Sequence, residues 1–383
     1  MKESFVPLAN AVIDLEALTN NYLLLKKTVG EIICVVKANA YGNGAAVCSR
    51  ALSRVGASKF AVANLGEAIK LRRALPRQDA EILILGYTPA KYAAILRENR
   101  FSQAVISSEH GKELLASGEK LRVHIAIDTG MNRVGYSDLL PQTVTDLAAL
   151  GACPKIRIEG IFTHFACADL SEDSETARQF SRFCDFQKKL PTVISDRKPL
   201  IHLCNSAAAL RYPQMRADAS RCGLALYGLL PSSSVPDPGL RPVTALCAPI
   251  IAVHTAEKGS FIGYGATYIC RRRSIIATVP IGYGDGFLRS YSIGCTPHIN
   301  GKAAPIVGRI CMDMCMLDIT DIAEGGTTPS VGDIVWFYPR SDSTALDRVA
   351  SAAETINYEV ITNLTGRLGR TYLRDGSSLR LTK

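Results

Sequence analysis

Residues 32–42 of the chain read Ile-Ile-Cys-Val-Val-Lys-Ala-Asn-Ala-Tyr-Gly, an apolar run that ends in one lysine and continues into small residues. The β-branched residues favour a strand, and the residues after Lys37 favour a turn. An amine at the end of a buried strand is poorly solvated, which lowers its pKa and leaves more of the neutral form that attacks an aldehyde. The alternative is a strand-end lysine whose head group reaches water.

The same succession of a short apolar strand and a helical stretch recurs along the first part of the chain. The predicted strands are Ile32–Val36, Lys59–Ala63, Ile82–Leu85, Gln103–Ile106, Arg122–Ile127, Arg157–Phe162, Leu200–Leu203 and Arg221–Leu226. The helical stretches between them include Leu65–Ala74, Tyr92–Asn99, Leu139–Leu150 and Glu175–Lys189. Eight such units favour a (β/α)8 barrel of the TIM type, and a doubly wound sheet is the alternative.

A cluster of proline, serine and glycine at residues 231–239 indicates a linker. Beyond it the chain is rich in valine, isoleucine and threonine, with glycines between the runs, which predicts a mainly β second domain. We therefore expect a barrel in residues 1–236 and a β domain in residues 237–383, with one helix near Ala345–Ile356.

Composition limits the classes of function. The 383 residues are 47% hydrophobic and 21% charged, and no apolar stretch is long enough to span a membrane. Residues 1–7 include an acid and a proline, so we expect no secretory signal and a cytoplasmic location. The 12 cysteines form no Cys-x-x-Cys pair, and the six histidines lack metal-ligand spacing, so no metal site is expected. The net charge of +9 is dispersed, which argues against nucleic acid and suits small anionic ligands.

Polar residues end several of the predicted strands, and in a barrel these ends converge on one mouth. They are Lys37, Tyr41, Arg133, His164, His202, Asn205, Ser206, Arg221 and Gly223. Each has an ordinary structural interpretation alone: a packed histidine, a surface ion pair, a capping serine. The loops after strands seven and eight are the usual phosphate site of such barrels, which places Ser206 and Gly223 well for a phosphate. A nucleophilic lysine near a phosphate site suggests pyridoxal phosphate as the cofactor.

The motifs of the chain resemble those of the alanine racemase family, nearly from end to end and in the family's order. In the first domain they are Lys37–Gly42, Asp128–Met131, Thr163–Ala166, Asn205–Ala208 and Tyr227–Gly228; in the second they are Gly263–Tyr268, Pro280–Gly286, Gly308–Asp313 and Thr355–Val360. The resemblance implies a racemase of L- and D-alanine that supplies D-alanine for peptidoglycan, working as a head-to-tail homodimer whose active site is shared across the interface.

The resemblance also implies a role for each site residue. Lys37 would bind pyridoxal phosphate as a Schiff base and act as one catalytic base, and Tyr264 of the second domain, delivered from the partner subunit, would act as the other. The remaining cofactor-binding positions would be Tyr41, His164, Asn205, Ser206, Arg221, Gly223, Leu224 and Tyr358. Arg133, Met312 and Tyr283 would meet the amino-acid substrate.

Two bases on opposite faces suit racemisation, because a proton must leave one face of the α-carbon and return to the other. A free tyrosine has a pKa near 10, so Tyr264 needs nearby positive charge, such as Arg221 acting through His164, to serve as a base at neutral pH. A non-catalytic carrier of the cofactor and a related decarboxylase are the other possibilities. The second domain with Tyr264 disfavours the carrier, and no cysteine motif of a decarboxylase is evident near the carboxy end.

The chain departs from the family pattern at Ala126, where most relatives carry a lysine, often carbamylated, that orients the substrate-binding arginine. Alanine cannot do this, so we expect a small anion such as chloride, or a neighbouring polar side chain, to hold Arg133. Asn43 and Gly369 also differ from the usual histidine and proline. The substrate preference is therefore open, with serine, or a broader set of amino acids, as the competitor to alanine.

Overall fold

The computed structural model describes residues 7–76, 79–190, 198–374 and 377–380, the last stretch as backbone only. Most of the segment 1–7, on which the expectation about a secretory signal depends, lies outside the described residues. The chain forms two compact units. The barrel unit comprises Leu18–Ala40 and Gly44–Leu240, and the β unit comprises the chain up to Ala17, Tyr41–Asn43 and the chain from Arg241 onward.

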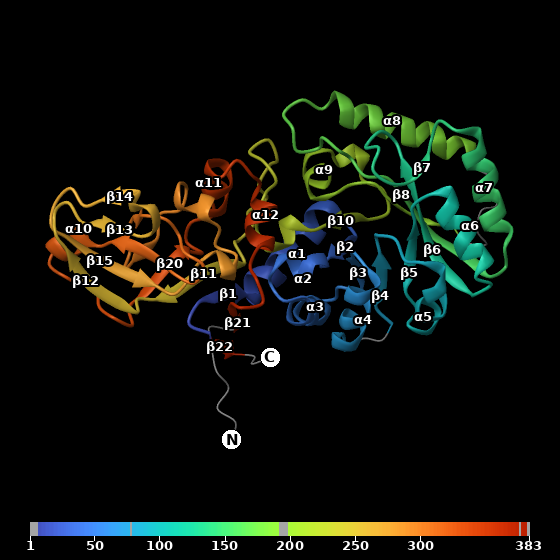
Figure 1. Cartoon of the computed structure of the whole chain (residues 1–383). Coiled ribbons are helices and arrows are strands. Elements are labelled where there is room, and N and C mark those ends of the chain that lie inside the picture. The colour runs from blue at the N-terminus through green and yellow to red at the C-terminus, as the bar shows by residue number, and fades with distance from the viewer. Residues whose placement is uncertain (1–6, 77–78, 191–197, 375–376, 381–383) are drawn as a thin grey trace, which may run out of the picture. The chain divides into compact units, whose positions relative to one another are not determined.

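Parallel strands form the wall of the barrel unit, and helices lie on its outside (Figure 1). The strands run in the order β10, β2, β3, β4, β5, β6, β8, β9, with β7 attached to β6. Their bounds are β2 Ile32–Val35, β3 Lys59–Val62, β4 Glu81–Ile84, β5 Ser102–Val105, β6 Leu121–Asp128, β7 Tyr136–Ser137, β8 Ile156–Phe162, β9 Leu200–His202 and β10 Ser220–Cys222. Backbone bonds from Ala219 N to Ile201 O (3.3 Å) and from Arg221 N to Cys204 O (2.9 Å) join β10 to β9. The predicted (β/α)8 barrel is confirmed.

The helices of the barrel unit follow its strands in turn. They are α1 Leu15–Val29 (which begins in the β unit), α3 Ala45–Arg54, α4 Leu65–Ala74, α5 Ala93–Glu98, α6 Ser108–Ala116, α7 Pro141–Ala152, α8 Ser174–Lys189 and α9 Ser206–Arg211. Short 3-10 helices are η1 Ala90–Tyr92, η2 Pro213–Met215 and η3 Leu224–Tyr227. Strands such as β2 are buried at every position, as expected for a parallel sheet covered by helices.

One predicted strand is wrong in its second half. The stretch Arg221–Leu226 was expected to be extended, but the strand ends at Cys222 and η3 begins at Leu224. The backbone of Gly223 (φ −116°, ψ −91°) leaves the β region, which turns the chain directly after Arg221. The turn separates the buried guanidinium from the amides of Gly223 and Leu224.

The β unit contains two sheets and a hairpin. The larger sheet has the order β17, β16, β20, β11, β1, β21, β22, and the smaller has the order β12, β15, β19, β18. The strands of the β unit are β1 Asn10–Asp14, β11 Thr244–Pro249, β12 Ala252–Ala256, β13 Phe261–Ile262, β14 Tyr268–Ile269, β15 Ser274–Val279, β16 His298–Ile299, β17 Lys302–Ala303, β18 Ile306–Val307, β19 Cys315–Asp318, β20 Ile334–Tyr338, β21 Gly369–Arg374 and β22 Ser377–Arg380. The mainly β character of this part is confirmed.

Helices in the β unit are short. They are α10 Thr320–Glu324, α11 Ala345–Ala352 and α12 Asn357–Thr362, with 3-10 turns η4 Tyr264–Ala266, η5 Tyr283–Asp285 and η6 Arg289–Ser292. The sequence did not reveal β1, which pairs antiparallel with β11 and parallel with β21. The expected division at residues 236 and 237 stays a prediction about the order of domains along the chain.

Candidate active site

Lys37 opens a left-handed turn. It follows β2 after one residue, Val36, and the next four residues all have positive φ: Ala38 (50°), Asn39 (55°), Ala40 (56°) and Tyr41 (52°). This conformation costs roughly 1–2 kcal/mol per residue outside glycine. The carboxylate of Glu67 offsets part of that cost, since Oε1 accepts from Ala38 N at 2.8 Å while Oε2 accepts from Ala63 N at 2.8 Å.

The amine of Lys37 is half-buried, and its pKa is lowered. Burial is the largest cause, and the positive charges of Arg133 and Arg221 act in the same direction, while Glu67 opposes them. A larger share of the amine is therefore neutral near pH 7 than for a lysine in water. The environment that the sequence predicted for a nucleophilic lysine is present.

Arg221 lies inside the barrel without a carboxylate partner among the described residues. Its Nη2 donates to Thr163 O (2.7 Å) and Leu203 O (3.0 Å), and its Nη1 donates to the carbonyl of His202. The guanidinium also lies over the ring of Phe162, 5.1 Å from its centroid. Burial lowers the pKa of Arg221 to about 10, so the group is still charged at neutral pH.

Two histidines bond this arginine from opposite sides. His202 Nδ1 lies 2.9 Å from Nη1, and His164 Nδ1 lies 3.1 Å from Nη2. Burial, and next the charge of Arg221, hold the pKa of both histidines well below 6.5. Both rings are therefore neutral at pH 7. The sequence prediction that Arg221 and His164 are linked agrees with this geometry.

A small cradle forms where β9 and β10 end. Asn205 caps α9 through a bond from Ala208 N (3.0 Å), and the Ser206 hydroxyl accepts from Gly223 N at 3.0 Å. Ser206, Gly223 and Leu224 are all buried. A hydroxyl beside the amides that begin a helical turn is a donor set typical of phosphate binding.

Arg133 lies exposed in the loop after β6, and no carboxylate or carbonyl of the described residues accepts a bond from it. Ala126, two residues before the end of β6, is buried and offers only a methyl group. The neighbouring polar side chain that could replace the usual lysine is thus not found among the described residues. The small-anion alternative stays a prediction.

The other predicted site residues belong to the β unit. Tyr41 and Tyr358 face each other with ring centroids 6.1 Å apart. Tyr283 and Met312 lie on adjoining loops, since Tyr283 N bonds Cys311 O (3.1 Å) and Gly284 N bonds Met312 O (2.9 Å). Tyr264 is 72% exposed, in a turn between two glycines with φ of 73° and 72° that only glycine adopts readily.

Sequence reasoning missed Glu67 and the part played by His124. Glu67 has a signal in the sequence, because Asn64 and Glu67 have the spacing of a helix cap, and Asn64 Oδ1 indeed accepts from Glu67 N at 3.0 Å. His124 Nδ1 lies 2.8 Å from His202 Nε2, a contact across the barrel that no local pattern encodes.

Among the described residues, no group of three or more His, Cys, Asp or Glu is arranged to hold a metal ion, and all twelve cysteines are free. In the same part of the chain, the helices lack the combined length and apolar character needed to cross a membrane.

A barrel with a poorly solvated lysine and a phosphate cradle at its mouth, followed by a β domain, defines a class of lysine-dependent barrel enzymes. The family model described as "Alanine racemase, N-terminal domain" matches residues 13–231, and "Alanine racemase, C-terminal domain" matches residues 243–372. The alanine racemase of Clostridium perfringens (strain SM101 / Type A) is 37% identical, over 97% of each chain.

Solved structures agree with these matches. The alanine racemase of Clostridium difficile 630 superposes with a TM-score of 0.90 at 33% identity, over 98% of each chain. That of Bartonella henselae, solved with covalently bound pyridoxal phosphate, has a TM-score of 0.84 at 30% identity, over 96% of this chain and 99% of the other. The chain belongs to the alanine racemase family, and it is an amino-acid isomerase.

Proposed function

We propose that this chain interconverts L- and D-alanine by moving the α-proton between two bases, Lys37 and the Tyr264 of a partner subunit. The observation that carries the proposal is the Lys37 amine, which is half-buried beside Arg133 and Arg221 and has a lowered pKa. Such an amine can take up a proton and give it back near neutral pH.

The residues at the barrel mouth fit pyridoxal phosphate as the cofactor. Lys37 would supply a neutral amine for its aldehyde, and the Ser206 hydroxyl and the Leu224 amide would supply donors for its phosphate. The Gly223 amide, which donates to Ser206 Oγ in this structure, would add a third donor by exchanging that bond for one to the phosphate. Arg221 would supply the ring nitrogen with a donor that keeps its proton, and His164 would contact the ring. Asn205 holds the cradle in place, and the hydroxyls of Tyr41 and Tyr358 would add donors to the phosphate. When bound, the cofactor withdraws electrons and makes the α-proton of an attached amino acid acidic.

His164 supports the second base. Arg221 has no acceptor atom, so the ring nitrogen that faces it, Nδ1, must be the unprotonated one. The proton of the neutral ring is therefore on Nε2, which can donate to a phenolate. A donor backed by a guanidinium favours the charged form of a tyrosine placed there, as Tyr264 requires.

A homodimer would deliver that tyrosine. Tyr264 is too exposed for a buried role within its own unit, and Phe261 and Ile269 of the neighbouring hairpin are 65% and 57% exposed. Contiguous exposed apolar side chains mark a surface that binds another protein. We propose that this hairpin and the Tyr264 turn pack against a second copy of the chain.

Arg133 is proposed to bind the substrate carboxylate together with the main chain near Met312, while Tyr283 lines the approach to the site. An arginine with no protein partner favours a small anion beside it, in keeping with Ala126 in place of a charged side chain. Because of the same departure from the family pattern, the substrate preference stays open, and serine is the second candidate substrate. The D-alanine produced would serve peptidoglycan synthesis in the cytoplasm.

The test is to incubate purified holoenzyme with L-alanine or L-serine and follow both enantiomers by chiral chromatography. We expect D-alanine to appear and the mixture to reach equal amounts. If neither amino acid interconverts while the cofactor is bound, the proposal is wrong.

Tyr264→Phe separates the racemase from a non-catalytic carrier of pyridoxal phosphate. The variant should keep the visible absorbance of its bound cofactor and lose turnover by about 10²- to 10⁴-fold, the usual contribution of one acid–base group. Tyr268→Phe, which changes a nearby half-buried tyrosine, is the matched control and should retain turnover.

A further inference from the structure

Four side chains form one hydrogen-bonded chain through the interior of the barrel. His124 Nδ1 lies 2.8 Å from His202 Nε2, His202 Nδ1 lies 2.9 Å from Arg221, and Arg221 lies 3.1 Å from His164 Nδ1. The ring of Phe162 stacks on His202 with centroids 4.8 Å apart and planes at 13°, and so supports the middle of the chain.

Arg221 determines which ring nitrogen carries the proton in each histidine of this hydrogen-bonded chain. His202 Nδ1 faces the guanidinium and is therefore unprotonated, so the proton of the neutral ring is on Nε2. Nε2 then donates to His124 Nδ1, which must accept, so the proton of neutral His124 is on its own Nε2. Burial agrees with neutrality, since it lowers the pKa of His124 to about 4. The hydrogen-bonded chain thus has an N–H donor at each end, Nε2 of His124 and Nε2 of His164.

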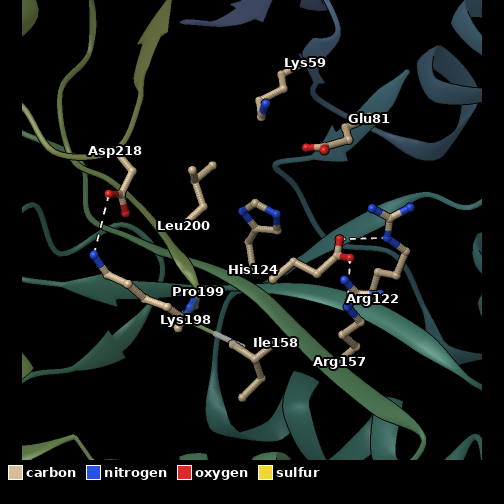
Figure 2. Close-up of a pocket in the computed structure, with 11 residues that line it drawn as sticks. Lys59, Glu81, Arg122, His124, Arg157, Ile158, Lys198, Pro199, Leu200 and Asp218 are labelled. Carbon is tan, nitrogen blue, oxygen red and sulfur yellow. Dashed lines mark hydrogen bonds and ion pairs between the residues drawn. The ribbon is translucent and has the colours of Figure 1, made fainter. Parts of the chain in front are cut away.

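The outer end of the chain lies in a cavity at the amino-terminal ends of the barrel strands, opposite the mouth. The cavity has a volume of about 380 Å³ and is lined from β3, β4, β6 and β8 and from the residues that precede β9 and β10 (Figure 2). His124 is only 5% exposed and stands among the lining side chains. No described residue bonds its Nε2, and this atom is not among the fully enclosed polar atoms that lack a partner, so its N–H borders the open space of the cavity.

The backbone is arranged to accommodate this histidine. His124 faces Gly160 on β8, and the register of the two strands shifts between Val123 and His124. A Cβ at position 160 would collide with the His124 ring. The glycine and the register shift therefore make room for the imidazole inside the barrel, so the conformation of the His124 side chain is fixed by its surroundings.

The charges around the cavity favour an anion. Glu159 is already neutralised by Arg122 (2.7 Å) and Arg157 (3.3 Å), and Asp218 lies 3.9 Å from Lys198. That leaves Lys59 on β3 and Glu81 on β4, which are register neighbours at the cavity rim and do not form a close ion pair. The lining also includes the His124 ring and the guanidinium groups of Arg122 and Arg157, and as a whole it carries one more cationic side chain than acidic ones.

We propose that this cavity is a binding site for a small oxyanion, a carboxylate or a phosphate, held by His124 Nε2–H and Lys59 at the end of the chain that leads to Arg221. An oxyanion supplies the acceptor that His124 lacks, and its charge is met by Lys59 and the guanidinium groups beside it.

The experiment uses holoenzyme labelled with ¹⁵N only in its six histidines, so that the phosphate cradle is already filled. Long-range ¹H–¹⁵N correlation at pH 7.5 reports the tautomer of each ring. We expect His124, His164 and His202 to be neutral with the proton on Nε2, with His124→Gln and His202→Gln identifying their signals. A proton on Nδ1 of His124 would contradict the proposed order of hydrogen bonds, and the proposal would then be wrong.

Sodium sulfate and sodium formate, as probes for phosphate-like and carboxylate ligands, are then titrated separately at constant ionic strength. The Nε2 signal of His124 should move and saturate, while that of exposed His254 should not. Saturation with sulfate alone identifies a phosphate-like ligand, and with formate alone a carboxylate. Lys59→Ala should weaken binding at least tenfold, Glu81→Gln should strengthen it, and Lys70→Ala, which removes an exposed lysine outside the cavity, should leave it unchanged.

If neither probe gives a saturating shift, the proposal is wrong. If the shift saturates but is insensitive to both Lys59→Ala and Glu81→Gln, the cavity holds an adventitious ion only, which also overturns it. Because these readouts do not involve turnover, they separate this inference from the proposed racemisation.

Discussion

The two ends of the barrel arrange their charged groups differently. At the mouth, Lys37 and Arg133 form no ion pair with a carboxylate of the described residues, and Glu67 accepts bonds from backbone amides. At the amino-terminal end, Glu159 bridges two arginines. Unbalanced positive charge marks the end where an anionic cofactor and substrate would bind, and ion pairs mark the end that usually contributes stability. His124 is the exception that joins the second end to the first.

The largest expected effect is at the mouth. Lys37→Ala should reduce the rate of alanine racemisation by at least about 10³-fold, since it removes both the cofactor attachment and one base. Chiral chromatography measures the rate, and thermal unfolding checks that the fold survives. Lys70→Ala, an exposed lysine of the same unit, is the control. Retention of more than a tenth of the activity would contradict the role of Lys37.

Gly160→Ala should break the connection between the two ends. The added methyl group collides with the His124 ring, and overpacking of this kind costs about 1–3 kcal/mol in the free energy of unfolding. Urea denaturation measures the loss. Gly66→Ala, in the first turn of α4 where alanine is favoured, should show a smaller loss, because its methyl group would lie 3.3 Å from only one side-chain oxygen, that of Asn64. Equal stability of the two variants would show that His124 is not confined as described.

Acid should lower the free energy of unfolding through the buried histidines of the hydrogen-bonded chain. Its histidines have pKa values below 6.5, so the unfolded chain binds protons between about pH 6.5 and 4 that the folded chain does not. Stability is therefore lost as pH falls through that window, by about 1.4 kcal/mol per pH unit for each histidine, and is unaffected by them above it. Urea denaturation at pH 7, 6 and 5 measures the slope. His202→Gln should reduce the slope, and a flat profile in the unmodified protein would contradict neutral histidines.

The smallest effect tests how the mouth holds Arg133. Replacing chloride by a bulky organic anion at constant ionic strength, without added bicarbonate, should lower kcat/KM several-fold, because one exposed ion contact contributes about 1 kcal/mol. Restoring chloride should restore the rate. An unchanged rate would rule out the anion and leave the orientation of Arg133 to the substrate itself.

Most of the fold could be predicted because it is encoded locally. Most buried strands of the barrel are short apolar runs with turns between them, so β2 to β6, β8 and β9 were found within a few residues of their observed bounds, whereas the two-residue β7 was not predicted. The strand β1 was missed because its partners, β11 and β21, are more than 200 residues away. The end of β10 was missed because Gly223 turns the backbone within an otherwise β-forming run.

The candidate site divides in the same way. Lys37, Arg133, His164 and Arg221 follow or lie on strands and could be placed at the mouth from that fact alone. The contact of His124 with His202 could not, since it requires a glycine on the neighbouring strand and a shift in register. The holding of the Lys37 turn by Glu67 depends on a side chain from the next strand–helix unit and was equally hidden.

The left-handed turn after Lys37 has a consequence for the order in which the protein matures. A free chain rarely adopts four successive non-glycine residues of this hand, because each costs about 1–2 kcal/mol. The bonds that hold the turn come from Glu67 and from Val36 at the end of β2, so they exist only after β2, β3 and α4 have assembled. The poorly solvated amine therefore forms only once these three elements have come together. A nascent or partly folded chain presents an ordinary, protonated lysine to the aldehydes of the cell, and it becomes reactive only when the site that controls it is complete.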